Sequence, residues 1–297
     1  MAVGESLVQS HRYGVDKERP DVLLLSLHGT DRPGQSGLER EIPSLRSFAG
    51  GDDDRLLDEY LNLDADRGAA SIARETAAYI TKRARELRTD VVTVDVPLGY
   101  LDVDVLDTAK AARQVINPEY RQTAIELLKQ FHTGVIAALD RHAASLANDG
   151  VVISFHTCAP HNRRQQVPER YGSLAGYIAS FTDTTQQGIG RYIDLVTALP
   201  NGERLADMRL TGSVSKALGD AGLRYEMNRP FSLQPGTWQE RIFREHNGLA
   251  IDLPKDRVLD GASKQITRGL ASAPLNSGKI EGLGTLFGRA VLDCLGR

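Results

Sequence analysis

Three short apolar runs, rich in β-branched residues and each closed by a polar residue or a proline, constrain the fold of this chain most. They are "VLLLSL" (22–27), "VVTVDV" (91–96) and "GVVISF" (150–155), and their length and composition are typical of buried strands. Two longer segments with apolar residues at helical spacing, 68–88 and 117–146, separate the runs. This alternation predicts a three-layer α/β/α domain with a mainly parallel or mixed central sheet and helices on its faces.

The chain has enough apolar residues to form one large core. It has 297 residues, of which 41% are hydrophobic, and no change in composition divides it. We therefore expect a single domain over residues 1–297, with residues 1–20 and 270–297 at its periphery.

Charge and cysteine content limit the classes of partner. The formal net charge is −3 and no dense Lys/Arg tract is present, so the sequence gives no electrostatic reason to expect nucleic acid or a membrane surface as a partner. A small molecule is the expected partner, and a homo-oligomer is left open. The N-terminal residues lack the features of a secretion signal, so we expect a cytoplasmic protein. With two cysteines, Cys158 and Cys294, a metal would be held by His, Asp and Glu.

The predicted strands end in residues that bind metals. Strand-like runs lead into His28 and His156, and a later one, "LAID", ends in Asp252. In an open α/β sheet the ligand site lies beyond the carboxyl ends of the strands. Two imidazoles and a carboxylate from such positions form the set that holds a catalytic zinc with one position open.

The residues alone leave the carboxylate ligand open among Asp31, Asp64 and Asp66. Asp31 follows His28 by three residues, and the other two precede the first long helical segment. A serine hydrolase with the same "HG" loop would need a G-x-S-x-G turn, which the chain lacks.

The order of these motifs resembles the N-formylglutamate amidohydrolases over roughly residues 20–260. The stretches that carry the resemblance are "SLHGT" (26–30), "LDADRGAASIA" (63–73), "VVTVDV" (91–96), "INPEYRQTAIELLKQFHTGV" (116–135), "GVVISFHTCAP" (150–160) and "MNRPFSLQPGTWQERIFREHNGLAIDLPKDRV" (227–258). The resemblance implies the phosphorylase/hydrolase-like fold that this family shares with zinc carboxypeptidases. It also implies His28, Asp66 and His156 as the metal ligands, with Asp64 as the nearest substitute. Zinc is the expected ion, and the same donors also suit iron or manganese.

The resemblance also suggests catalytic and substrate-binding residues, but this sequence differs from the family pattern at two places. Asp252 is the candidate base that accepts the water proton, where the family usually carries the longer Glu. The family's Asn-Arg motif, which grips a substrate carboxylate, is replaced by "VDVPLGYLDVDVLD" (94–107). The remaining candidates are His161 as a proton donor and Arg163, Arg164, Asn228 and Arg229 as substrate-binding residues. The carboxylates Asp102, Asp104 and Asp107 of the replacing stretch suggest a basic substrate as a further hypothesis.

The expected function is zinc-dependent hydrolysis of an amide bond in a small N-acyl or N-formyl amino acid or a related amide. Two alternatives stay open at this point. One is a peptidoglycan-type amidase or carboxypeptidase on the same fold, and the other is a non-catalytic small-molecule binding protein that kept the fold.

Overall fold

The computed structural model describes residues 3–29, 36–49, 54–112, 119–158, 174–176, 178, 192–260 and 273–297. Within these residues a seven-stranded sheet has the order β1-β3-β2-β4-β7-β5-β6. The strands are β1 (Val8–Gly14), β2 (Val22–Ser26), β3 (Arg88–Val94), β4 (Val151–Cys158), β5 (Ile193–Val196), β6 (Tyr225–Met227) and β7 (Asn247–Pro254).

The sheet is mixed around a parallel centre, which confirms the predicted fold class. Strands β3, β2, β4 and β7 pair in parallel, while β1 is antiparallel to β3 and β5 is antiparallel to β7. Every residue of β2 and of β3 is buried, because parallel strands in the middle of such a sheet are covered on both faces.

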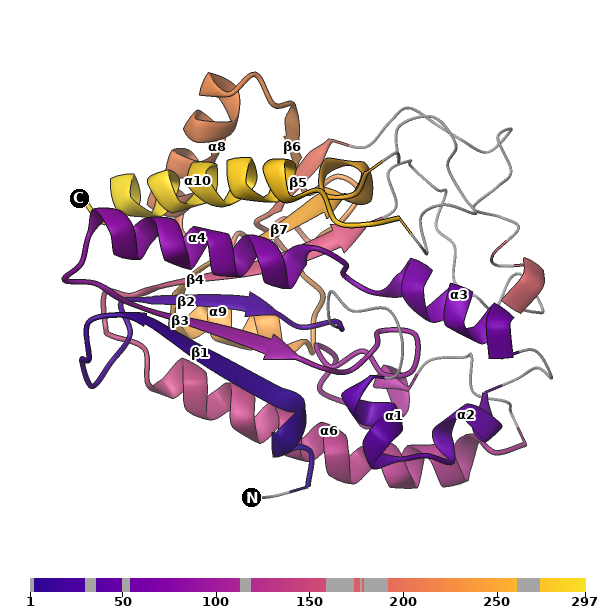
Figure 1. Cartoon of the computed structure of the whole chain (residues 1–297). Helices are drawn as coiled ribbons and strands as arrows, with labels where there is room; N and C mark the ends of the chain where they lie inside the picture. Colours follow the sequence, from indigo (N-terminus) through magenta and orange to yellow (C-terminus); the bar gives the residue numbers. More distant parts are fainter. Residues whose placement is uncertain are drawn as a thin grey trace.

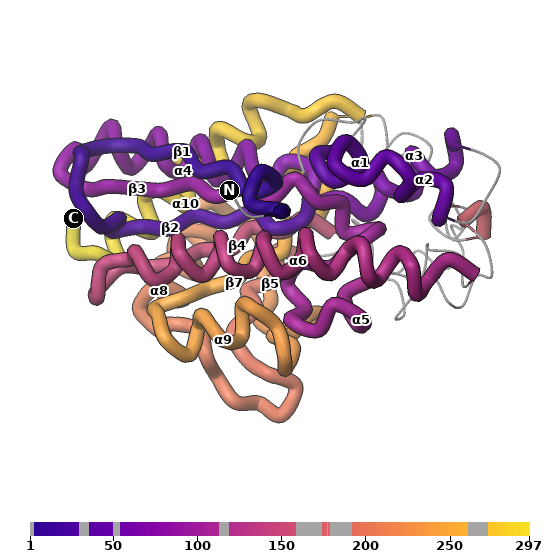
Figure 2. The backbone as a smooth tube through the Cα atoms, turned by 90° about the horizontal axis from the view of Figure 1, so that it is seen from below, coloured from indigo at the N-terminus to yellow at the C-terminus, as the bar shows by residue number. Residues whose placement is uncertain are grey.

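Helices form the outer layers. Helices α4 (Ala69–Arg83) and α10 (Ser277–Cys294) lie on one face, and α6 (Arg121–Ala144) and α9 (Trp238–Glu245) lie on the other (Figures 1 and 2). Helix α8 (Met208–Asp220) packs against α10. The shorter elements are α1 (Gly37–Glu41), α2 (Leu45–Phe48), α3 (Asp54–Asp64), α5 (Thr108–Ala111) and the 3₁₀ turns η1 (Glu5–Leu7) and η4 (Lys255–Arg257). None of the helices in the described ranges is long and apolar enough to cross a membrane.

Residues 192–222 contain the strand β5 followed by α8. Helix α6 begins at Arg121, and residues 113–118 lie outside the described part.

The two ends of the chain are less peripheral than expected. Strand β1 extends the sheet by pairing with β3 along its full length. Helix α10 buries Leu283, Phe287 and Val291 and packs along α4. The C-terminal helix is therefore part of the core.

Two glycines allow α10 to approach α4 closely. A Cβ atom added at Gly284 would lie 2.4 Å from the Cβ of Glu75, and one added at Gly288 would lie 2.7 Å from Cδ1 of Tyr79. Gly282, in the same helix, has nothing within 4 Å of such a Cβ.

We expect Gly284→Ala to destabilise the fold although alanine favours helix. The added methyl forces the two helices apart at a cost of about 1–3 kcal/mol. Gly282→Ala is the matched control and should stabilise the protein by about 0.5–1 kcal/mol through helix propensity. Urea unfolding of both variants measures the difference, and equal stabilisation by both substitutions would contradict the close helix contact.

Candidate metal centre

Three residues from separate segments meet at the carboxyl end of the parallel strands. His28 follows β2 by two residues, His156 lies near the end of β4, and Asp66 lies between α3 and α4. Because β2 and β4 are parallel neighbours, they deliver the two imidazoles side by side, with ring centroids 5.2 Å apart. One candidate ligand atom from each of the three residues lies within 4.8 Å of the others.

Hydrogen bonds fix the carboxylate of Asp66 between the two strands. Its Oδ2 lies 2.9 Å from Nδ1 of His156, and its Oδ1 accepts a hydrogen bond of 3.2 Å from the backbone N of Thr157. The backbone N of Asp66 donates to the carbonyl of His28 at 2.9 Å. The segment that carries Asp66 is therefore tied to both histidine-bearing segments.

The residues present fit a divalent metal ion. His28 is buried, and none of the described residues forms a hydrogen bond with its Nδ1. An unsatisfied buried polar atom costs about 1–3 kcal/mol, and coordination would satisfy it. Two imidazole nitrogens and one carboxylate oxygen are the ligand set of many catalytic zinc sites.

The two histidines differ in their protonation state. Burial lowers the pKa of His28, so this imidazole is neutral at pH 7. Burial also acts to lower the pKa of His156, but the hydrogen bond and the negative charge of Asp66 outweigh it and raise this pKa to about 9. In the absence of a metal, a proton shared by His156 and Asp66 thus neutralises the charge at the centre.

Zinc binding is expected to strengthen as the pH rises toward 9. An imidazole that binds a metal must be neutral, so a bound ion would displace the His156 proton, and the apparent affinity should increase by about tenfold per pH unit between pH 7 and 9. The same proton stabilises the metal-free fold. Since the pKa is raised from 6.5 to about 9, that contribution is complete below pH 6.5 and lost as the pH rises through 9. Competition with a chelator of known affinity measures the effect, and an affinity that is constant from pH 7 to 8.5 would contradict it.

Asp252 lies on the strand next to His156. The two residues are register partners in the parallel pair of β4 and β7, and the charge of Asp252 contributes to the raised pKa of His156. Its side chain is half-buried. This predicted base therefore lies beside the candidate metal centre.

The other sequence predictions lie elsewhere or outside the described residues. Asn228 is held by the turn after β5: its Oδ1 accepts hydrogen bonds of 2.8 and 2.9 Å from the backbone N of Thr197 and Ala198. These contacts hold the side chain of Asn228 against this turn, and its role in substrate binding stays a prediction. Arg229 is exposed. Asp31, His161, Arg163 and Arg164 lie outside the described part of the chain.

The three acidic residues of the stretch that replaces the family's Asn-Arg motif have local partners. Asp102 Oδ1 lies 3.6 Å from Nε2 of His28. Asp104 accepts a hydrogen bond from the backbone N of Gln239. Burial and the charge of Asp102 raise the pKa of Asp104 to about 7. Asp107 caps the short helix α5. Asp102 therefore lies beside His28, Asp104 is bonded to the first turn of α9, and the basic substrate stays a hypothesis.

Sequence reasoning missed two partners of His156. Nε2 of His156 lies 3.0 Å from Oγ of Ser154 and 2.6 Å from Nε2 of Gln239. The spacing of two residues along one strand could have indicated Ser154, because such residues share a face of the sheet. Gln239 gave no signal, since it lies 83 residues from His156 on an ordinary amphipathic helix.

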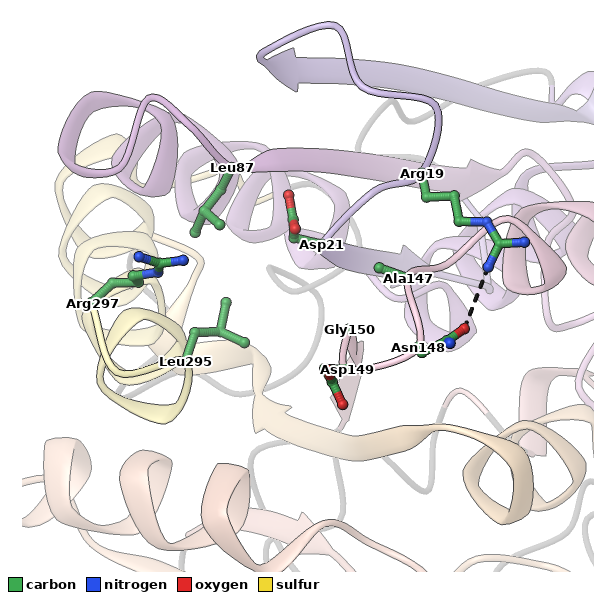
Figure 3. A pocket seen from close by; sticks show the side chains of 9 residues that line it. All are labelled: Arg19, Asp21, Leu87, Ala147, Asn148, Asp149, Gly150, Leu295 and Arg297. Atoms are coloured by element: carbon green, nitrogen blue, oxygen red, sulfur yellow. Dashed lines mark hydrogen bonds between the residues drawn. The ribbon is translucent and has the colours of Figure 1, made fainter.

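A separate pocket of about 470 Å³ lies at the opposite end of the sheet (Figure 3). Asp21 and Gly150, which line it, immediately precede β2 and β4. Arg19 and Arg297 also contribute. Because His28 and His156 lie toward the other ends of the same strands, this pocket is not part of the candidate metal centre.

Solved structures show the same fold. An N-formylglutamate amidohydrolase from Ralstonia eutropha JMP134 is 11% identical, with a TM-score of 0.58 over 96% of this chain and 97% of that one. A gene product from Agrobacterium tumefaciens is 15% identical, with a TM-score of 0.53 over 100% of this chain and 98% of that one. No protein-family model matches the chain, and no curated protein matches it in sequence. The fold that the sequence resemblance implied is thus confirmed: the chain has an amidohydrolase-like fold.

Proposed function

We propose that this protein is a metal-dependent amidohydrolase that cleaves the amide bond of a small N-acyl or N-formyl amino acid or a related amide. One observation carries the proposal: two histidines and one aspartate at the carboxyl end of the sheet bring one ligand atom each within 4.8 Å. The buried Nδ1 of His28, without a hydrogen-bond partner among the described residues, supports it.

His28, Asp66 and His156 would hold the ion. Zinc is the proposed ion because two imidazoles and a carboxylate are typical zinc donors, and iron and manganese accept the same set. Zinc in such a site supplies Lewis acidity, which lowers the pKa of bound water toward about 7 and polarises a substrate carbonyl.

Asp252 is proposed as the residue that moves the proton. As the base, it would take the proton of the attacking water and deliver it to the leaving amide nitrogen. Its place on β7, in register with His156, supports this assignment. Asp is one methylene shorter than the Glu that the resemblance would lead one to expect.

The residues proposed to bind the substrate lie mostly outside the described part of the chain. Arg163 and Arg164, close after His156 in sequence, would bind a substrate carboxylate through paired N–H groups. His161 would donate a hydrogen bond or a proton to the reacting group. Arg229 is exposed and stays in the proposal as a further candidate.

Turnover of N-acyl amino acids tests the proposal. The purified protein with zinc is offered the N-formyl and N-acetyl derivatives of acidic, neutral and basic amino acids, and release of the free amine is measured. We expect hydrolysis of at least one class that stops when a chelator removes the metal and returns with zinc. Binding of these compounds without turnover would instead favour a non-catalytic binding protein, and turnover that a chelator leaves unchanged would contradict the metal centre.

A further inference from the structure

Each histidine of the candidate centre turns its second ring nitrogen toward a polar partner. For His28 the partner is Asp102, whose Oδ1 lies 3.6 Å from Nε2. For His156 the partners are Gln239 and Ser154, at 2.6 and 3.0 Å from Nε2. The Nδ1 atom of His156 faces Asp66, and the Nδ1 atom of His28 has no hydrogen-bond partner in the described ranges. Both rings therefore present Nδ1 as the nitrogen available to a metal.

The partners on the Nε2 side belong to one structural unit. The backbone N of Asp104 donates to Oδ1 of Asp102 at 3.2 Å. Oδ1 of Asp104 accepts a hydrogen bond of 2.8 Å from the backbone N of Gln239. The backbone carbonyl of Asp104 accepts one of 2.6 Å from the backbone N of Trp238. The turn at 102–104 and the first turn of α9 are thus bonded together.

This unit is anchored away from the centre. Trp238 is fully buried, and its Nε1 donates to Oδ1 of Asp140 on α6 at 2.8 Å. The side chain of Gln239, 5% exposed, extends from the unit to β4, where it contacts Ser154 and His156. The backbone of Gln239 is thus bonded within this unit, while its carboxamide contacts His156.

We propose that Gln239 is a positioning residue that fixes the ring of His156 for metal binding, and that Asp102 does the same for His28. The inference rests on the proposed function, because it assumes a metal at His28, Asp66 and His156.

The chemistry of imidazole ligation explains why these partners suit the role. An imidazole bound to a metal through one nitrogen carries a hydrogen on the other, and a hydrogen-bond acceptor there fixes the ring orientation and the tautomer. Asp102 offers carboxylate oxygens to His28. A carboxamide has a donor and an acceptor at nearly the same position, so Gln239 can offer its oxygen to the N–H at Nε2 of His156.

The test is the zinc affinity of Gln239→Met, measured by competition with a chromophoric chelator. Methionine fills a similar volume but offers His156 no strong hydrogen bond, so the affinity should fall by about 10–100-fold. Gln239→Glu, which keeps an acceptor at this position, should keep most of the affinity. Gln130→Met on the exposed face of α6 is the matched control and should bind zinc like the wild type.

The outcomes separate this inference from the proposed function. If the wild type binds zinc and Gln239→Met binds it equally well, the positioning role is wrong and the metal centre stands. If the wild type binds no zinc, both are overturned. Thermal melts in the presence of a chelator show whether Gln239→Met is folded. If it is not, Asp102→Ala decides the matter: an affinity about 10-fold below the wild type supports positioning of the rings, and an unchanged affinity refutes it.

Discussion

Replacing either His28 or His156 with alanine is expected to reduce zinc affinity by more than about 100-fold, the upper limit for residues that only orient a ligand. Each substitution removes one of the three candidate ligands. In His156→Ala the carboxylate of Asp66 still accepts a hydrogen bond from the backbone N of Thr157. The lower zinc affinity can therefore be assigned to the missing imidazole. Metal-dependent turnover should disappear together with the bound metal.

His11→Ala is the control for these two variants. His11 is exposed on the edge strand β1, far in sequence from both ligands, and its removal should leave zinc affinity and turnover unchanged. Zinc titrations of all three variants, with circular dichroism to verify folding, measure the effect. Retention of wild-type affinity by a folded His156→Ala protein would mean that the metal binds elsewhere.

Asp252→Asn is expected to keep the metal and to lower kcat by about 10²–10⁴-fold, the usual contribution of a general base. Asparagine has the shape of aspartate but cannot accept the proton from water. Asp252 is not one of the three candidate ligands. Its charge helps raise the pKa of His156, so removing it favours the neutral imidazole that binds a metal.

Asp220→Asn serves as the control for charge removal. Asp220 lies at the exposed end of α8, where it pairs with Lys216, and its substitution should not change kcat. Single-turnover kinetics with zinc content measured in the same samples separate loss of the base from loss of the metal. An unchanged kcat in zinc-loaded Asp252→Asn would exclude Asp252 as the base.

The sequence predicts the parallel centre of the sheet because burial on both faces leaves a clear trace. Strands β2 and β4 contain continuous apolar runs, and β3 ends in the shorter apolar stretch that begins at Val91. Strand β1 is mostly exposed at the edge and has no such run, and β5 and β6 have four and three residues. Their places depend on pairing with distant strands, which local composition does not record.

The sequence predicts some residues of the candidate centre and misses others, because some of the contacts depend on the packing of distant segments. His28 and His156 follow from a general rule about strand ends, whereas Asp66 is singled out from its neighbours only by the family resemblance. In the sequence, Asp102 suggests a positively charged substrate. In the structure, its carboxylate lies beside His28. Gln239 reaches His156 only because α9 packs against the sheet, 83 residues later in the chain.

The metal content of the wild-type protein, purified without a metal-affinity column and measured by mass spectrometry, tests the central claim most directly. The metal centre predicts about one equivalent of zinc per chain, or one equivalent taken up when zinc is offered at pH 8 and retained through gel filtration. Protein that is folded, metal-free and still empty after this treatment would contradict the metal centre and the hydrolytic function proposed from it.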